Sequence, residues 1–149
     1  MKKLVKILAL TLVCVLGIVA LAACGGASIN TNYDEAVANL KANGYTVMEA
    51  KGDDSSLAGF VLMYGIQASD VEAAVMATKG EEEDGEEVSI LWLKSEDAAK
   101  KVVEAAEAMY DAEKELADAM GIDLPSIKIG RSGNVAYMGT NAAIKATNA

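Results

Sequence analysis

The stretch VSILWL at residues 88–93 decides the fold, because it is the strongest β-strand signal in the chain. β-Branched and aromatic side chains of this kind are enriched in strands. Upstream, residues 71–78 place apolar side chains at every second position, and an acidic loop at residues 80–87 separates the two stretches. This order predicts an antiparallel hairpin with a long acidic tip.

A long helix is expected directly after this hairpin. Ser95 is a favourable N-cap, and Glu96 and Asp97 stand in the first turn, where the helix dipole favours negative charge. Small and apolar residues recur at spacings of three and four as far as about Met120, and Gly121 ends the helix. The narrow stripe expected to lie on a sheet consists of Ala98, Val102, Ala105, Met109, Ala112, Leu116 and Ala119.

A second hairpin and a short helix are expected at the C-terminal end. Residues 127–131 and 134–138 form two strand signals, and Ser132-Gly133 between them is a two-residue turn signal. Thr140 is a cap for a last helix that runs to about Lys145.

The N-terminal part of the domain contains a helix, a strand and one ambiguous segment. Asp34 is expected to cap a helix that runs to about Asn43, and residues 45–49 form a short strand. Residues 57–66 fit a buried strand as a continuous apolar run and fit a helix by their i, i+3, i+4 spacing. Capping signals on both sides favour the helix, and the strand remains an alternative.

Two hairpins imply antiparallel pairing, and the helices must bury their apolar stripes on the resulting sheet. The sequence therefore predicts a single α+β domain. We expect a two-layer sandwich in which an antiparallel sheet of about five strands carries helices mainly on one face. The other face would be left for solvent or a partner.

The charge balance argues against two kinds of partner. The chain has 149 residues and a formal net charge of −9. Residues 1–23 contain three lysines and no acidic residue, so the remainder has 10 basic and 22 acidic residues, a net charge of −12. So acidic a domain is repelled by nucleic acid and by anionic lipid head groups, which means that any membrane contact requires an anchor.

The first 24 residues have the order of a secretory signal. Lys2, Lys3 and Lys6 form a basic region, residues 4–20 are nearly all apolar, and small residues precede Cys24. A stretch of this length could also span a bilayer as an uncleaved helix.

The sequence Leu21-Ala22-Ala23-Cys24 resembles the lipobox of bacterial lipoproteins. The resemblance implies a diacylglycerol on the Cys24 sulfur and cleavage just before it. It divides the chain into a signal peptide at 1–23, an acylated flexible tether at 24–32 and one acidic domain at 33–149.

The resemblance also implies a location, the extracytoplasmic face of the cell membrane, with two acyl chains supplying the stable attachment that one chain lacks. The ending GRSGNVAYMGT at residues 130–140 is similar to that of small uncharacterised lipoproteins of Gram-positive bacteria. This second similarity brings no activity with it.

The residue types argue against catalysis. The chain has no histidine, and its two cysteines are Cys14 in the leader and Cys24 at the lipidation position. No general base, nucleophile motif or cofactor motif stands out. The acidic run is at most a weak candidate for a metal site and more simply a solvated hairpin tip. Its members are Glu81, Glu82, Glu83, Asp84 and Glu86.

We therefore expect a non-enzymatic envelope protein that binds another protein or a small ligand. The candidate surface is a sheet face exposing Trp92 or Tyr137, although Trp92 on so strong a strand is also a natural core residue. The alternative is an extracytoplasmic metal-dependent or hydrolytic enzyme that uses the acidic residues.

Overall fold

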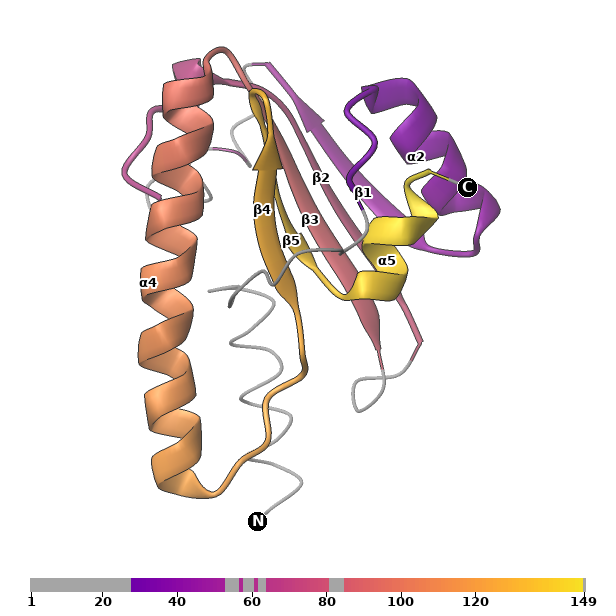
Figure 1. The fold of residues 1–149 in the computed structure, drawn as a ribbon. Coiled ribbons are helices and arrows are strands. Elements are labelled where there is room, and N and C mark those ends of the chain that lie inside the picture. The colour runs from indigo at the N-terminus through magenta and orange to yellow at the C-terminus, as the bar shows by residue number, and fades with distance from the viewer. Residues whose placement is uncertain (1–27, 53–56, 58–60, 62–63, 81–84, 149) are drawn as a thin grey trace.

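The computed structural model describes residues 28–52, 57, 61, 64–80 and 85–148. Five antiparallel strands form one sheet in the order β1-β2-β3-β5-β4 (Figure 1). The strands are β1 (Thr46–Lys51), β2 (Val71–Lys79), β3 (Glu86–Leu93), β4 (Lys128–Ser132) and β5 (Val135–Gly139). The helices are α2 (Tyr33–Ala42), the 3₁₀ turn η1 (Ala68–Asp70), α4 (Glu96–Met120) and α5 (Asn141–Ala146).

The chain order explains the position of β5. The hairpin β2–β3 pairs in register, with Val75 opposite Ile90. Helix α4 then carries the chain to the far edge of the sheet, where β4 begins, and the turn after β4 returns β5 into the gap between β4 and β3. The α+β class and the antiparallel five-stranded sheet predicted from the sequence are therefore confirmed.

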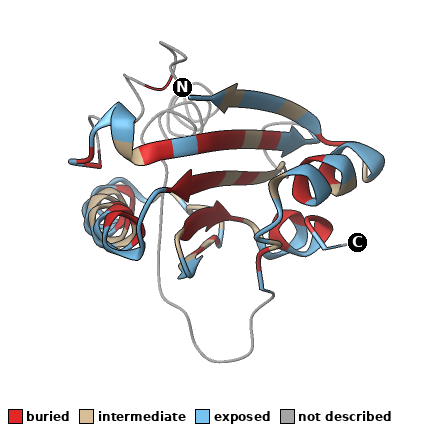
Figure 2. Ribbon diagram, turned by 90° about the horizontal axis from the view of Figure 1, so that it is seen from above, coloured by how far each residue is buried: buried red, intermediate tan, exposed pale blue. Residues whose placement is uncertain are grey.

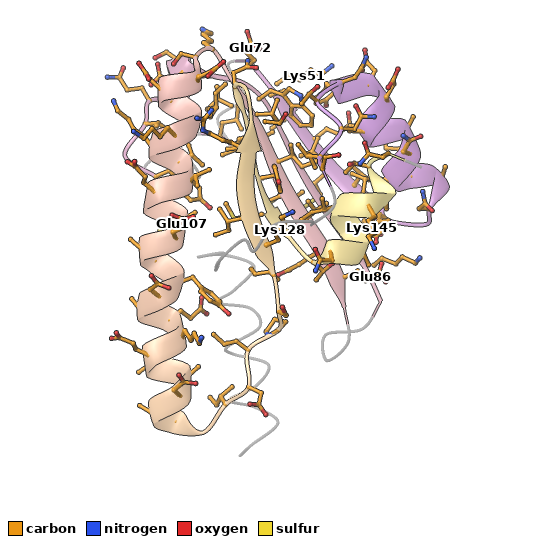
Figure 3. All side chains as sticks on the ribbon, in the orientation of Figure 1. Lys51, Glu72, Glu86, Glu107, Lys128 and Lys145 are labelled. Atoms are coloured by element: carbon orange, nitrogen blue, oxygen red, sulfur yellow. The ribbon has the colours of Figure 1, made fainter. Side chains whose placement is uncertain are left out.

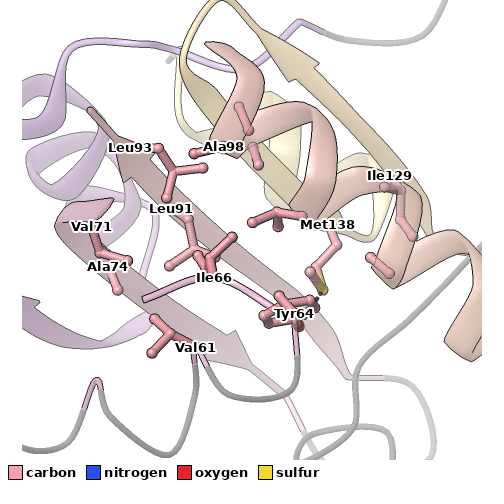
Figure 4. Packing of buried hydrophobic residues seen from close by; sticks show 14 of the residues in the cluster. Val61, Tyr64, Ile66, Val71, Ala74, Leu91, Leu93, Ala98, Ile129 and Met138 are labelled. Carbon is pink, nitrogen blue, oxygen red and sulfur yellow. Dashed lines mark hydrogen bonds between the residues drawn. The ribbon is translucent and has the colours of Figure 1, made fainter. Parts of the chain in front are cut away.

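Helices cover both faces of the sheet, which corrects the expectation that they lie mainly on one. Figure 1 shows α4 on one side of the sheet and α2 with α5 on the other. Each side has its own buried apolar cluster. The first lies between the sheet and α4 and includes Leu91, Leu93 and Met138 (Figure 4). The second lies under α2 and α5 and includes Ile90 and Trp92.

The central strands are apolar on both faces, and this is the physical reason for two cores. Because successive side chains of a strand point to opposite faces, Ile90 enters the second core and Leu91 the first. All five residues of β5 are buried. Figure 2 shows that the buried residues are concentrated in strands that are flanked by helices on both sides. A sheet built from such strands must be covered twice.

The long helix is confirmed, but its buried stripe differs from the expected one. The described buried residues of α4 are Ala98, Ala99, Val102, Ala106, Tyr110 and Ala117. At about 100° per residue, the buried positions Ala99, Ala106, Tyr110 and Ala117 lie about 80–120° around the helix from Ala98, to one side of the expected stripe. The expected positions Ala112, Leu116 and Ala119 are exposed.

Several element boundaries differ slightly from the predictions. Asn32, not Asp34, is the N-cap of α2 and accepts a hydrogen bond from the Glu35 amide. The turn of the second hairpin is Gly133-Asn134, with Gly133 in the left-handed region at φ +58°. Within residues 57–66, Leu57 and Val61 are helical and buried, which agrees with the favoured helix at these two positions. Residues 58–60 and 62–63 lie outside the described residues.

Candidate functional site

The segment that enters the domain is fastened to the segment that leaves it. The Asn30 amide donates to Thr147 Oγ1 at 3.1 Å, and the Asn30 side chain donates to the Thr147 carbonyl oxygen at 3.1 Å. The Asn148 side chain donates to the Ser28 carbonyl oxygen at 2.6 Å, and Ile29 is only 5% exposed. We call Ser28–Thr31 together with Thr147–Asn148 the terminal clasp.

The terminal clasp corrects the expected tether. Residues 24–32 were expected to form a flexible link, but Ser28–Asn32 are part of the folded domain. Ile29 belongs to the second core, and Asn32 begins α2. Residues 24–27 lie outside the described residues, as does the signal segment before them. Only three residues, Gly25, Gly26 and Ala27, therefore stand between Cys24 and the first described residue of the domain.

Thr147 is the polar centre of the terminal clasp. Its side chain is fully buried, and its Oγ1 donates to the Ile144 carbonyl oxygen at 2.7 Å while accepting from the Asn30 amide. Its carbonyl oxygen also accepts from the Asn39 side chain on α2 at 2.9 Å. Through these three contacts Thr147 links α2, α5 and the entering segment.

Trp92 and Tyr137, the surface expected from the sequence, are buried instead, at 6% and 7% exposure. Trp92 Nε1 donates to the Thr31 carbonyl oxygen at 2.7 Å, and its ring meets the Tyr33 ring edge-on at 5.0 Å. Burial raises the pKa of the Tyr137 hydroxyl. These rings are covered by α2, α5 and the terminal clasp, so neither presents a binding surface to solvent.

The absence of a side chain at Gly130 makes room for Tyr137. The two residues are cross-strand partners in the β4–β5 pair. A Cβ atom at Gly130 would lie 2.7 Å from the Tyr137 hydroxyl oxygen. The glycine in the GRSGNVAYMGT ending therefore has a packing role.

A polar cluster at the edge of the sheet joins α2 to β1. Glu49 accepts hydrogen bonds from Lys41 Nζ at 2.5 Å and from the Tyr33 hydroxyl at 2.7 Å. Lys51 Nζ lies 3.9 Å from the centroid of the Tyr33 ring, a cation–π contact. The hydrogen bond from Lys41, then that from Tyr33, lowers the pKa of Glu49. Burial, then the bond to Glu49, raises the pKa of Tyr33.

This polar cluster fastens two elements rather than assembling reactive groups. Its lysines and its carboxylate are charge partners, and none of its members forms a nucleophile–base pair of the kind that covalent catalysis needs. A similar contact lies at the other end of β1, where the Tyr45 hydroxyl donates to Glu86.

Little of the acidic candidate site falls within the described residues. Glu81, Glu82, Glu83 and Asp84 lie outside them, and Glu86 accepts the hydrogen bond from Tyr45. Within residues 28–52, 57, 61, 64–80 and 85–148, no group of three or more carboxylates is arranged to hold a metal ion.

The pKa of a second carboxylate, Glu113, is shifted in the opposite direction to that of Glu49. Burial, and then the negative charge of Glu87 on β3, raises the pKa of Glu113 on α4. Two carboxylates on facing elements are the kind of pair that acid–base chemistry uses, but that chemistry also needs a pocket that separates their pKa values. In the described part of the chain, no buried side-chain nitrogen or oxygen lacks a hydrogen-bond partner, so no interior polar group awaits a ligand.

The exposed apolar side chains were missed by the sequence reasoning. The large ones are Met48 at 61%, Leu116 at 58% and Met120 at 54%. Leu116 and Met120 are four residues apart on α4, so they lie on the same side of the helix. The length of this helix is the sequence feature that could have indicated them. A helix of 25 residues extends about 37 Å, and Figure 1 shows that the last turns of α4 pass the end of the sheet.

The comparisons with known proteins give no assignment. The chain matches no protein-family model, no curated protein and no solved structure. Of the helices among the described residues, none has both the length and the apolar character that crossing a bilayer requires.

Proposed function

We propose that this chain is a cell-envelope lipoprotein, anchored by a diacylglycerol on Cys24 and exposed on the extracytoplasmic face of the membrane. The anchored domain is a non-enzymatic binding domain for another protein or a small ligand.

The observation that carries the anchoring proposal is the position of Ser28. Its carbonyl oxygen is held by Asn148, and Ile29 is buried next to it. Every described element of the fold lies after Cys24 in the sequence, so cleavage before Cys24 removes none of them. A lipoprotein requires a domain that folds without the residues before its lipobox cysteine, and the described elements meet this requirement.

The binding role is supported by residue types and by the end of α4. Histidine is absent from the sequence, which removes the commonest general base. Leu116 and Met120 offer an apolar strip between acidic residues such as Glu115 and Asp118. Apolar residues with a charged rim are typical of protein contacts. With Trp92 and Tyr137 buried, this strip replaces them as the candidate contact surface.

The anchor is tested by intact mass spectrometry of the protein purified from native membranes. We expect a chain that begins at Cys24 and carries the added mass of a diacylglycerol. Cys24→Ala should leave the leader uncleaved and carry no lipid. A processed chain without lipid, or a mature chain that still begins at Met1, contradicts the anchoring proposal.

The binding role is tested by cross-linking and capture from intact membranes. We expect the wild-type protein and Met48→Asp to capture the same partner, and the double variant Leu116→Asp/Met120→Asp to lose it. Met48 is the matched control because it is an equally exposed apolar residue on β1. No partner, together with no change in melting temperature across a small-ligand panel, contradicts the binding role.

A further inference from the structure

The structure restricts how far the domain can move from its proposed anchor. Ser28 is held against Asn148, and the entering segment packs in the second core with α2 and α5. Cys24 lies four residues earlier, and four residues span at most about 14 Å when fully extended. Ser28, the described residue nearest to Cys24 in the sequence, is therefore on the side of the sheet that α2 and α5 cover.

The two sides of the molecule differ in charge. Helix α4 has eight acidic and three basic residues, a formal net charge of −5. The opposite side has two acidic and two basic residues over Ser28–Asn43 and Thr140–Asn148, a formal net charge of zero. Figure 3 shows Glu107 on α4 and Lys145 on α5 on opposite sides of the sheet. We call the exposed surface of the terminal clasp, α2 and α5 the α2–α5 face.

We infer that the anchored domain rests with its α2–α5 face on the lipid bilayer and with α4 turned away from it. The inference depends on the proposed function, because it takes Cys24 as the lipid-bearing residue. The partner is the bilayer surface itself, which is anionic in many membranes and repels negative charge within about a Debye length. The neutral side can lie within that distance, and the side carrying −5 is disfavoured there.

The dimensions agree with this orientation. Packed layers of secondary structure are about 10 Å apart, so α4 stands about 20 Å from the layer of α2 and α5. A link of about 14 Å that leaves from the α2–α5 face cannot carry the domain over to place α4 on the bilayer. The same orientation points Leu116 and Met120 away from the lipid, where a protein partner can reach them.

The orientation can be measured with single-cysteine reporters. In the proposed mature protein Cys14 is removed and Cys24 is acylated, so an introduced cysteine is the sole free thiol. Exposed alanines provide matched sites: Ala38→Cys on α2, Ala142→Cys on α5 and Ala108→Cys on α4. The full chain is processed in bacterial cells, labelled with a fluorophore and reconstituted into phosphatidylglycerol–phosphatidylethanolamine vesicles that contain a head-group nitroxide lipid as quencher.

We expect the labels at Ala38 and Ala142 to be quenched at least about threefold more strongly than the label at Ala108. Inserting ten glycine and serine residues between Gly26 and Ala27 leaves the described domain unchanged and should remove most of this difference. Equal quenching at the three sites, stronger quenching at Ala108, or a difference that survives the insertion overturns the inference.

A separate readout distinguishes this failure from failure of the anchor. Flotation of the labelled protein with the vesicles reports attachment, and intact mass reports the lipid on Cys24. Flotation combined with the wrong quenching pattern contradicts only the orientation. Loss of flotation and of the lipid mass contradicts the proposed function and, with it, the orientation that rests on that function.

Discussion

The two faces of the sheet are covered in different ways. One is covered by a single 25-residue helix that begins and ends at local signals, Ser95 and Gly121. The other is covered by two helices of ten and six residues and by the entering segment, which come from opposite ends of the chain. Helices this short are marginal in isolation. The second face therefore depends on contacts between residues more than a hundred positions apart, such as Asn30 and Thr147.

The largest expected effect on stability tests whether a hydrophobic core lies on each face of the sheet. Leu91→Ala removes a side chain from the first core and Ile90→Ala removes one from the second. Both residues are nearly fully buried, so each substitution should lower the free energy of unfolding by roughly 2–5 kcal/mol. Urea denaturation measures this. Met48→Ala, an exposed control, should change it by less than about 0.5 kcal/mol. A cost near zero for Ile90→Ala would mean that the second face is open.

The next effect tests the terminal clasp. Thr147→Val keeps the shape of the side chain but removes the hydroxyl that bonds Asn30 and Ile144. Because the Asn30 amide loses its acceptor, while the Ile144 carbonyl oxygen keeps the Thr147 amide as a donor, we expect the free energy of unfolding to fall by about 0.5–1.5 kcal/mol in chemical denaturation. Thr78→Val, at an exposed position on β2, is the control and should be nearly neutral. Equal stability of the two variants would contradict a structural role for the terminal clasp.

A smaller effect tests the link between α2 and β1. Hydrogen bonds from Lys41 and Tyr33 lower the pKa of Glu49 in the folded protein, so this carboxylate stabilises the fold above its unfolded pKa. That contribution is lost as pH falls through the lowered pKa. Glu49→Gln should therefore cost about 0.5–1 kcal/mol at pH 7 and almost nothing once pH has fallen below that lowered value. Glu72→Gln on β2 is the control, and a pH-independent difference would refute this assignment.

The smallest expected effect is an increase in the free energy of unfolding, whereas the three effects above are decreases. Burial and Glu87 raise the folded pKa of Glu113, so ionised Glu113 costs stability. The cost is absent below the unfolded pKa and grows as pH rises through the folded pKa. Glu113→Gln should stabilise the protein by a few tenths of a kcal/mol at pH 7, with the difference closing on acidification, as thermal melts over pH can measure. A destabilised variant at pH 7 would show that the carboxylate is paired.

The sequence was sufficient for the elements that local signals define. The two hairpins, the cap at Ser95 and the stop at Gly121 were all predicted from neighbouring residues, and the structure confirms them. The second layer of helices was not predicted, because antiparallel hairpins commonly form a sheet with one solvated face. The continuous apolar run of β5 was the contrary signal, since strands buried on both faces lose their alternation.

The candidate surface shows the same limit. Trp92 and Tyr137 have the residue types of a contact surface, but covering by α2 and α5 depends on long-range packing that no local pattern encodes. The predicted boundary between the tether and the domain was wrong for the same reason, because the partner of Asn30 is Thr147 at the far end of the chain. Lipidation of Cys24 remains a prediction from the lipobox.

Hydrogen exchange at the Asn30 backbone amide tests the central claim most directly, namely that the folded domain begins within four residues of Cys24. This amide donates to the buried hydroxyl of Thr147, and the Ile144 amide, which donates to the Thr140 carbonyl oxygen, is its reference on α5. We predict that the two amides are protected to a similar degree. Exchange of the Asn30 amide at the rate of an unstructured peptide, while the Ile144 amide stays protected, would contradict the account.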